Sequence, residues 1–117
     1  MAFRFEDLLV WKKGMDLNDE IHALGKSFPK DELFVLTSQM RRASDSVVLN
    51  IAEGSTGQTK PVFKTFLNYS LRSSIEVVNC LIIARRRNYI AEDVFKPLYD
   101  EYEVLAKMIT ALRNPLD

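Results

Sequence analysis

The sequence has little of what disulfide-rich, metal-binding and membrane proteins depend on. Cysteine occurs once, at Cys80, so no disulfide can form within the chain, which fits a reducing compartment. Histidine also occurs once, at His22, and one His with one Cys makes no ordinary zinc site. No apolar run approaches the ~20 residues that cross a bilayer, and the N-terminal segment lacks a signal-peptide layout. We therefore expect a cytoplasmic protein without metal, cofactor or membrane association.

Glycine and proline are also scarce, with four of each, and they mark the first two of three predicted connections. These connections are residues 25–31 (GKSFPKD), 54–60 (GSTGQTK) and 88–91 (NYIA). The four segments between them repeat apolar residues every three or four positions, which predicts amphipathic helices at about residues 7–26, 31–54, 60–88 and 91–113. Short connections make sequential helices antiparallel. The expected fold is all-α, a single domain over residues 1–117 that forms an up-down-up-down four-helix bundle.

The chain also lacks net charge, because 16 basic side chains balance 16 acidic ones, so it has no overall attraction for nucleic acid. The third predicted helix is nevertheless basic, and its cations are Lys60, Lys64, Arg72, Arg85, Arg86 and Arg87. Clustered arginines suit phosphate groups, and the neighbouring Tyr89 could stack on a base. Cations at the end of a helix also complement its dipole. The residues alone leave both interpretations open.

A polar stripe on the second predicted helix is the sharpest pattern. Its members, spaced by three or four residues, are Gln39, Arg42, Ser46, Asn50 and Glu53. Val48 and Leu49 flank the stripe, so this helix is apolar on more than one side, as buried helices are. We predict a structural polar network inside the bundle or at a subunit contact, in preference to a solvated face. A catalytic site is disfavoured because the stripe contains no nucleophile–base pair, and we expect no enzyme activity.

Surplus apolar residues are the second notable feature. Seven of them fall outside the main apolar faces, or seams, of the predicted helices: Phe34, Val48, Leu49, Ile82, Ile83, Phe95 and Tyr99. One four-helix core does not easily hold all of them. Single exposed apolar side chains are normal, whereas a contiguous exposed patch marks an interface. We expect self-association.

The second predicted helix also contains a recognisable run, QMRRA at residues 39–43 followed by NIAEG at residues 50–54. Together with Phe28-Pro29, Ser46-Val47 and Phe66-Leu67, this run resembles the 23S rRNA-intervening sequence proteins, also called S23 proteins. The resemblance covers nearly the whole chain. It implies a four-helix bundle that forms a homo-oligomeric, barrel-shaped pentamer, and it supplies no catalytic residues. Some members are encoded by insertions within bacterial 23S ribosomal RNA genes.

A related branch, the accessory variability proteins of diversity-generating retroelements, binds nucleic acid and a reverse transcriptase. That branch is strongly basic, whereas this sequence is neutral. Two functions are therefore expected from the sequence. The first is a non-enzymatic homo-oligomer that binds RNA, a ribonucleoprotein or a nucleic-acid-processing protein through the basic third helix. The alternative is a protein–protein scaffold without nucleic acid. The sequence also leaves open which of Arg41 and Arg42 points inward.

Overall fold

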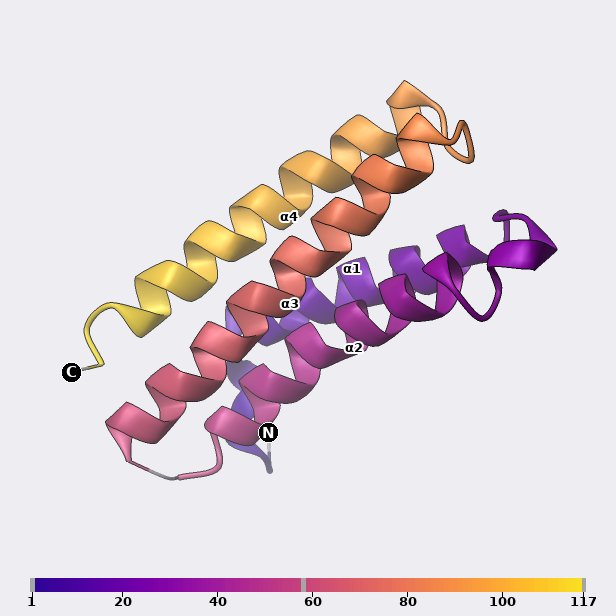
Figure 1. The fold of residues 1–117 in the computed structure, drawn as a ribbon. Helices are drawn as coiled ribbons and strands as arrows, with labels where there is room; N and C mark the ends of the chain where they lie inside the picture. The colour runs from indigo at the N-terminus through magenta and orange to yellow at the C-terminus, as the bar shows by residue number, and fades with distance from the viewer. Residues whose placement is uncertain (1, 58, 117) are drawn as a thin grey trace.

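Four antiparallel helices make up the computed structural model, which describes residues 2–57 and 59–116 (Figure 1). The helices are α1 (Leu9–Gly25), α2 (Leu36–Gly54), α3 (Lys60–Arg86) and α4 (Glu92–Arg113), and the 3-10 helices η1 (Arg4–Asp7) and η2 (Lys30–Glu32) precede α1 and α2. Met1, Gln58 and Asp117 lie outside the described residues, and Gln58 belongs to the predicted connection at 54–60.

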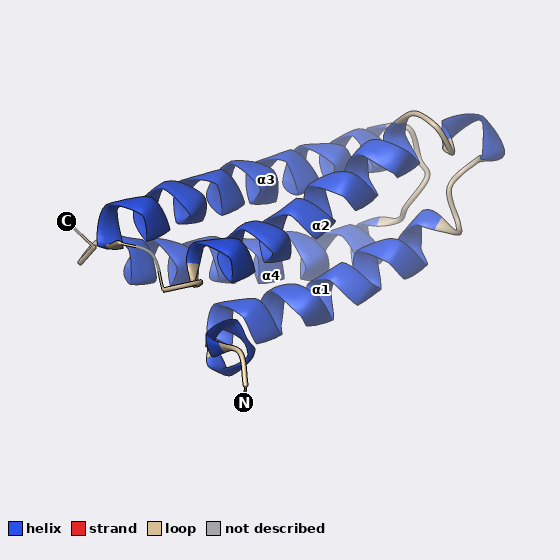
Figure 2. Ribbon diagram, turned by 90° about the horizontal axis from the view of Figure 1, so that it is seen from below, coloured by secondary structure: helices blue, strands red, loops and turns tan. Residues whose placement is uncertain are grey.

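Each helix packs against the next one in sequence, and α4 also packs against α1. The result is a rod of 43 × 22 × 22 Å in which all four helices run along the long axis (Figure 2). The predicted all-α, up-down-up-down bundle is confirmed. No helix in the described part of the chain is long and apolar enough to cross a membrane.

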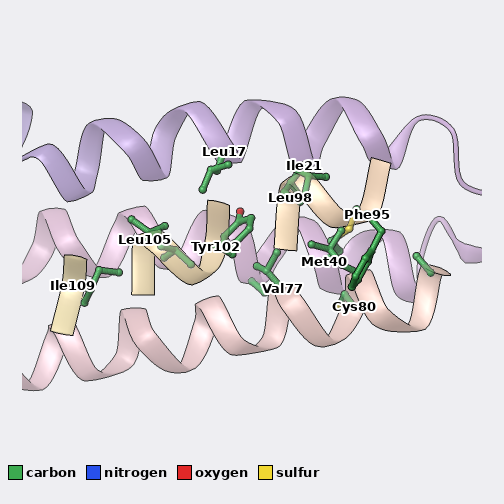
Figure 3. Close-up of a cluster of buried hydrophobic side chains, with 14 of the residues drawn as sticks. Leu17, Ile21, Met40, Val77, Cys80, Phe95, Leu98, Tyr102, Leu105 and Ile109 are labelled. Carbon is green, nitrogen blue, oxygen red and sulfur yellow. The ribbon is translucent and has the colours of Figure 1, made fainter. Parts of the chain in front are cut away.

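The predicted seams meet in one core, to which all four helices contribute side chains (Figure 3). Ile21, Met40, Leu105 and Ile109 are completely buried. Burying an apolar side chain of this size stabilises a fold by about 1.5–3 kcal/mol. Tyr102 lies among them, and burial raises the pKa of its hydroxyl to about 12. The core is therefore continuous along the rod rather than confined to one end.

The start of the second helix differs from the prediction. We expected this helix from about Asp31, but residues 30–32 form η2 and α2 begins at Leu36. Acidic side chains such as Asp31 and Glu32 are favourable in the first turn of a helix. Glu32 instead turns toward the α3–α4 connection, where its carboxylate accepts hydrogen bonds from Arg87 and Tyr89. The contact of Glu32 with Arg87 and Tyr89 thus outweighs the local preference of acidic residues for a helix N-terminus.

The end of α3 is a Schellman motif centred on Asn88, which has φ = +61°. The amide of Tyr89 donates to the carbonyl of Ala84, and the amide of Asn88 donates to the carbonyl of Arg85. Asparagine tolerates this left-handed backbone better than most residues do. The predicted connection at residues 88–91 therefore has a defined geometry.

Replacing Asn88 tests this geometry. Asn88→Val should lower the free energy of unfolding by about 1–2 kcal/mol, because a β-branched residue is strained at positive φ. Asn88→Gly is the matched control and should keep or slightly raise stability. Chemical denaturation measures both variants, and equal stabilities for the two would contradict the assignment.

Candidate functional site

A groove of about 590 Å³ runs between α2 and α3 on the outside of the bundle. Part of the predicted polar stripe lines it. The lining residues are Phe34, Val35, Ser38, Gln39, Arg42, Ala43, Ser46, Ser73 and Glu76. Two stripe members, Asn50 and Glu53, lie further along α2 and do not line the groove.

Hydrogen bonds join the two walls of the groove. Ser73 Oγ donates to Ser46 Oγ at 2.8 Å, and Asn50 Nδ2 donates to the same Ser46 oxygen at 2.9 Å. Nearer the start of α2, Gln39 Nε2 donates to Glu76 Oε2 at 3.1 Å. Three of the five stripe residues, Gln39, Arg42 and Ser46, thus line the groove, and Asn50 is tied to Ser46 within α2. The polar spacing follows the line where α2 and α3 meet.

The stripe does not lie inside the bundle, which corrects one form of the prediction. Gln39, Arg42 and Glu53 are exposed, and Ser46 and Asn50 are half-buried. The reason is that α2 buries only the seam toward α1 and α3, while Leu49 remains 63% exposed on its outer side. The other form of the prediction, a subunit contact, stays a prediction.

One end of the groove is apolar and unpartnered. Phe34 is 88% exposed and Val35 is 60% exposed. The side chain of Arg42, within the same groove, makes no hydrogen bond or ion pair with any described residue, and neither does the side chain of Glu53. Of the surplus apolar residues, the core takes Val48 and Phe95 fully, whereas Ile82, Ile83 and Tyr99 are half-buried. The exposed surplus is therefore concentrated at Phe34 and Leu49.

The six cations predicted for nucleic-acid contact do not form one surface. Lys60 and Lys64 lie in the first turns of α3, and Arg85–Arg87 lie at its other end. A helix rises 1.5 Å per residue, so these groups are roughly 35 Å apart. Arg72 lies between them, with its guanidinium 5.9 Å from the ring centroid of Tyr69.

Intramolecular contacts already occupy several of these cations. Arg85 lies 3.9 Å from the ring centroid of Phe95 and 3.5 Å from Glu92 Oε2. Arg87 pairs with Glu32 at 2.8 Å. The side chains of Lys60 and Arg86 are exposed and make no polar contact with the described residues.

Tyr89 is engaged as well, which corrects its expected role as a stacking platform. Its hydroxyl donates to Glu32 Oε2 at 2.8 Å, and its ring packs 5.7 Å from that of Phe28, centroid to centroid. The ring is half-buried. The contacts with Glu32 and Phe28 therefore occupy the hydroxyl and part of the ring of Tyr89.

The profile of the family described as 23S rRNA-intervening sequence protein matches residues 6–111. The chain belongs to this family. It is also similar in structure to a protein of unknown function from the S23 ribosomal protein family of Bacteroides thetaiotaomicron VPI-5482. The TM-score is 0.84 at 22% identity, with 91% of this chain and 99% of that chain covered, and this likeness shows the shared fold. A search of curated proteins finds no match.

Within this family member, the structure separates the two arginines of the QMRRA run. Arg41 is half-buried, and its Nη2 donates to the carbonyl of His22 on α1 at 3.0 Å. Arg42 is exposed and lines the α2–α3 groove. Arg41 is the one that points inward. The two adjacent arginines therefore contribute to two different surfaces.

Gly54, the last residue of the NIAEG run, brings α2 close to α3. A Cβ at this position would lie 2.7 Å from the Cβ of Phe66 and 2.9 Å from Cδ1 of Phe63. Such distances require the backbone or both aromatic side chains to shift. Gly54 therefore permits the close packing of α2 against the first turns of α3.

A second polar cluster, which the sequence did not reveal, joins α1, α2 and α4. Asn18 Nδ2 donates to Ser44 Oγ at 2.9 Å and to Asp45 Oδ1 at 2.8 Å. The same Asp45 oxygen lies 2.7 Å from Nε2 of His22, and Ser44 Oγ lies 3.3 Å from the buried hydroxyl of Tyr102. Asn18 and His22 are four residues apart and therefore lie on one helical face. This spacing is the feature of the sequence that indicates the cluster. Over residues 2–57 and 59–116, no group of three or more potential metal ligands gathers.

Glu32 forms a clasp between the two connections at one end of the bundle. Its Oε2 accepts hydrogen bonds from the hydroxyl of Tyr89 and from Nη1 of Arg87, both at 2.8 Å. The bond from Tyr89, with the bond and charge of Arg87, holds the pKa of Glu32 below its ordinary value of 4.5, although burial opposes this. The clasp therefore favours an ionised Glu32.

Replacing Glu32 with Gln should make the free energy of unfolding less dependent on acid pH. Because the folded-state pKa is lowered, the ionised clasp stabilises the fold above pH 4.5 and loses this effect as the pH falls through the folded-state pKa. The stability difference between the natural protein and Glu32→Gln should therefore be largest near neutral pH and shrink below pH 4.5. Urea titrations from pH 3 to pH 7 measure it, with the exposed Asp19→Asn as the control.

Proposed function

We propose that this protein is a non-enzymatic assembly unit that functions as a homo-oligomer, and that its α2–α3 groove receives another copy of the chain. The observation that supports this most directly is the exposed pair Phe34 and Val35 beside Arg42, whose side chain has no described partner. Exposed apolar side chains next to polar groups are typical of protein interfaces. Zero net charge also removes long-range repulsion between copies.

The complementary surface in this proposal is the face between α3 and α4. A shallow depression there is lined by apolar Ile75, Val78 and Tyr99 and by the acidic Glu103. Ile75 is 67% exposed. An apolar and acidic surface suits a groove that offers Phe34 and the unpaired Arg42. The two surfaces differ, so the contact is head-to-tail and closes into a ring when its rotation allows. The family resemblance suggests five copies.

Light scattering after size exclusion tests this assembly. The natural chain should have a mass near five times its 13.5 kDa monomer. Phe34→Lys should shift the mass toward the monomer, because a buried unpaired ammonium is costly at an interface. Leu9→Lys replaces a side chain that is 70% exposed at the start of α1 and should keep the oligomer. A monodisperse natural monomer at micromolar concentration would refute the proposal.

RNA or ribonucleoprotein binding is the second candidate function. Fewer cations are available for RNA than the sequence suggested, because Arg85 and Arg87 are paired with acidic side chains. The exposed side chains of Lys60 and Arg86 make no polar contact with the described residues. In an oligomer these cations would recur in every copy, and multivalency would raise the affinity for a long polyanion.

Filter binding of a structured RNA over a salt series distinguishes the two functions. If RNA binds, Lys60→Gln/Arg86→Gln should weaken the affinity and flatten its salt dependence, because each lost phosphate contact lowers the slope by about 0.7–0.9. The paired Arg85→Gln should change the slope less. No binding at low salt would leave the scaffold function alone.

A further inference from the structure

A separate cleft of about 370 Å³ lies at the end of the bundle where α1 stops and α2 begins. Its lining residues are Gly25, Lys26, Phe28, Pro29, Lys30, Leu33, Thr37 and Arg41. None of them lines the α2–α3 groove. Three are cationic and none is acidic, although the chain as a whole is neutral.

Two buried polar atoms in the cleft wall lack a hydrogen-bond partner among the described residues. They are Oγ1 of Thr37, a residue that is 1% exposed, and Nε of Arg41. A buried polar group without a partner is costly, and native proteins contain few of them. Thr37 and Arg41 are one turn apart on the same face of α2. One ligand carrying several oxygens could therefore engage both.

Contacts with α1 hold Arg41 in place. Its Nη2 donates to the carbonyl of His22 at 3.0 Å, and its guanidinium lies against Gly25, where a Cβ would be 2.7 Å from Nε. Any side chain at residue 25 would displace the guanidinium. Arginine has five N–H donors, and the described contacts use one of them. Arg41 is thus held in place, and most of its N–H donors remain available for a ligand.

The surrounding charges favour an anion. Glu32, in the same connection, is committed to Arg87 and Tyr89, and Asp31 does not line the cleft. The positive charge in the cleft is that of Lys26, Lys30 and Arg41.

We propose that this cleft binds a phosphate-type oxyanion, with Arg41 and Thr37 as the donors in its wall and Lys26 and Lys30 at its rim. Arginine matches phosphate oxygens through paired hydrogen bonds, and lysines add charge to the same group. A free phosphate, a small phosphate ester and the phosphodiester of a nucleic acid share this chemistry. The site depends neither on the proposed self-association nor on Lys60 and Arg86.

Titration with inorganic phosphate, against chloride at constant ionic strength, tests the site on the full-length protein. The readout is the ¹⁵N–¹H resonance of Arg41 Nε, which should shift saturably as the orphan donor gains an acceptor. The Tm should rise with the same apparent Kd, because a ligand that binds only the folded state stabilises it.

Variants separate the site from general salt effects. Lys26→Gln/Lys30→Gln and the isosteric Thr37→Val should each weaken phosphate binding, by about tenfold for the double variant, since charge-assisted contacts are lost. The matched control Lys12→Gln/Lys107→Gln removes two exposed lysines elsewhere and should keep the affinity. An equal Tm rise in all variants would overturn the proposal, because excluded phosphate stabilises most proteins without a site.

A second titration identifies the source of the phosphate group. A short single-stranded RNA that moves the Arg41 resonance at lower concentration than phosphate supports a phosphodiester ligand, whereas a response to phosphate alone supports a small ligand. No saturable shift with either probe would refute the site. A resonance that moves with protein concentration and not with phosphate would also overturn it, because a second copy would then cover the cleft.

Discussion

The close packing of α2 against α3 positions the outer surface on which the proposed self-association depends. Ser70, which is completely buried, donates to the carbonyl of Val47 at 2.8 Å, so small polar side chains replace bulky ones at this helix contact. Ser46 and Ser73 continue the contact outward, and Gly54 lets the helices approach at the other end. Because these residues are small, the backbones of α2 and α3 lie close together along this contact.

The fold could be predicted because periodicity acts over whole helices. Positions such as Leu17, Ile21, Leu105 and Ile109 recur every three or four residues, and all of them reached the core. The start of α2 could not be predicted in the same way. Asp31 and Glu32 look like the first turn of a helix, and only the folded chain brings Arg87 within 2.8 Å of Glu32. A contact across 55 residues leaves no local pattern.

The candidate site was predicted only in part, for a related reason. The spacing of Gln39, Arg42 and Ser46 correctly placed them on one stripe of α2, but burial depends on what lies opposite that stripe. The pairing of Ser46 with Ser73 and of Gln39 with Glu76 depends on the register between two helices. Sequence periodicity gives the face of each helix and not the register between two helices. The hydrogen-bond partners could therefore not be predicted. The cationic cleft was missed because Lys26 and Lys30 lie in a connection, where no periodicity relates them to Arg41.

The clasp at Glu32 has a consequence for local motion. It ties η2, between α1 and α2, to Arg87 and Tyr89 at the α3–α4 connection. Connections usually open independently, and their amides exchange with solvent earlier than those of the core. Here, release of one connection breaks the hydrogen bonds that hold the other. The two segments therefore form one cooperative opening unit, and their amide protons should exchange with a shared protection factor although they are far apart in sequence.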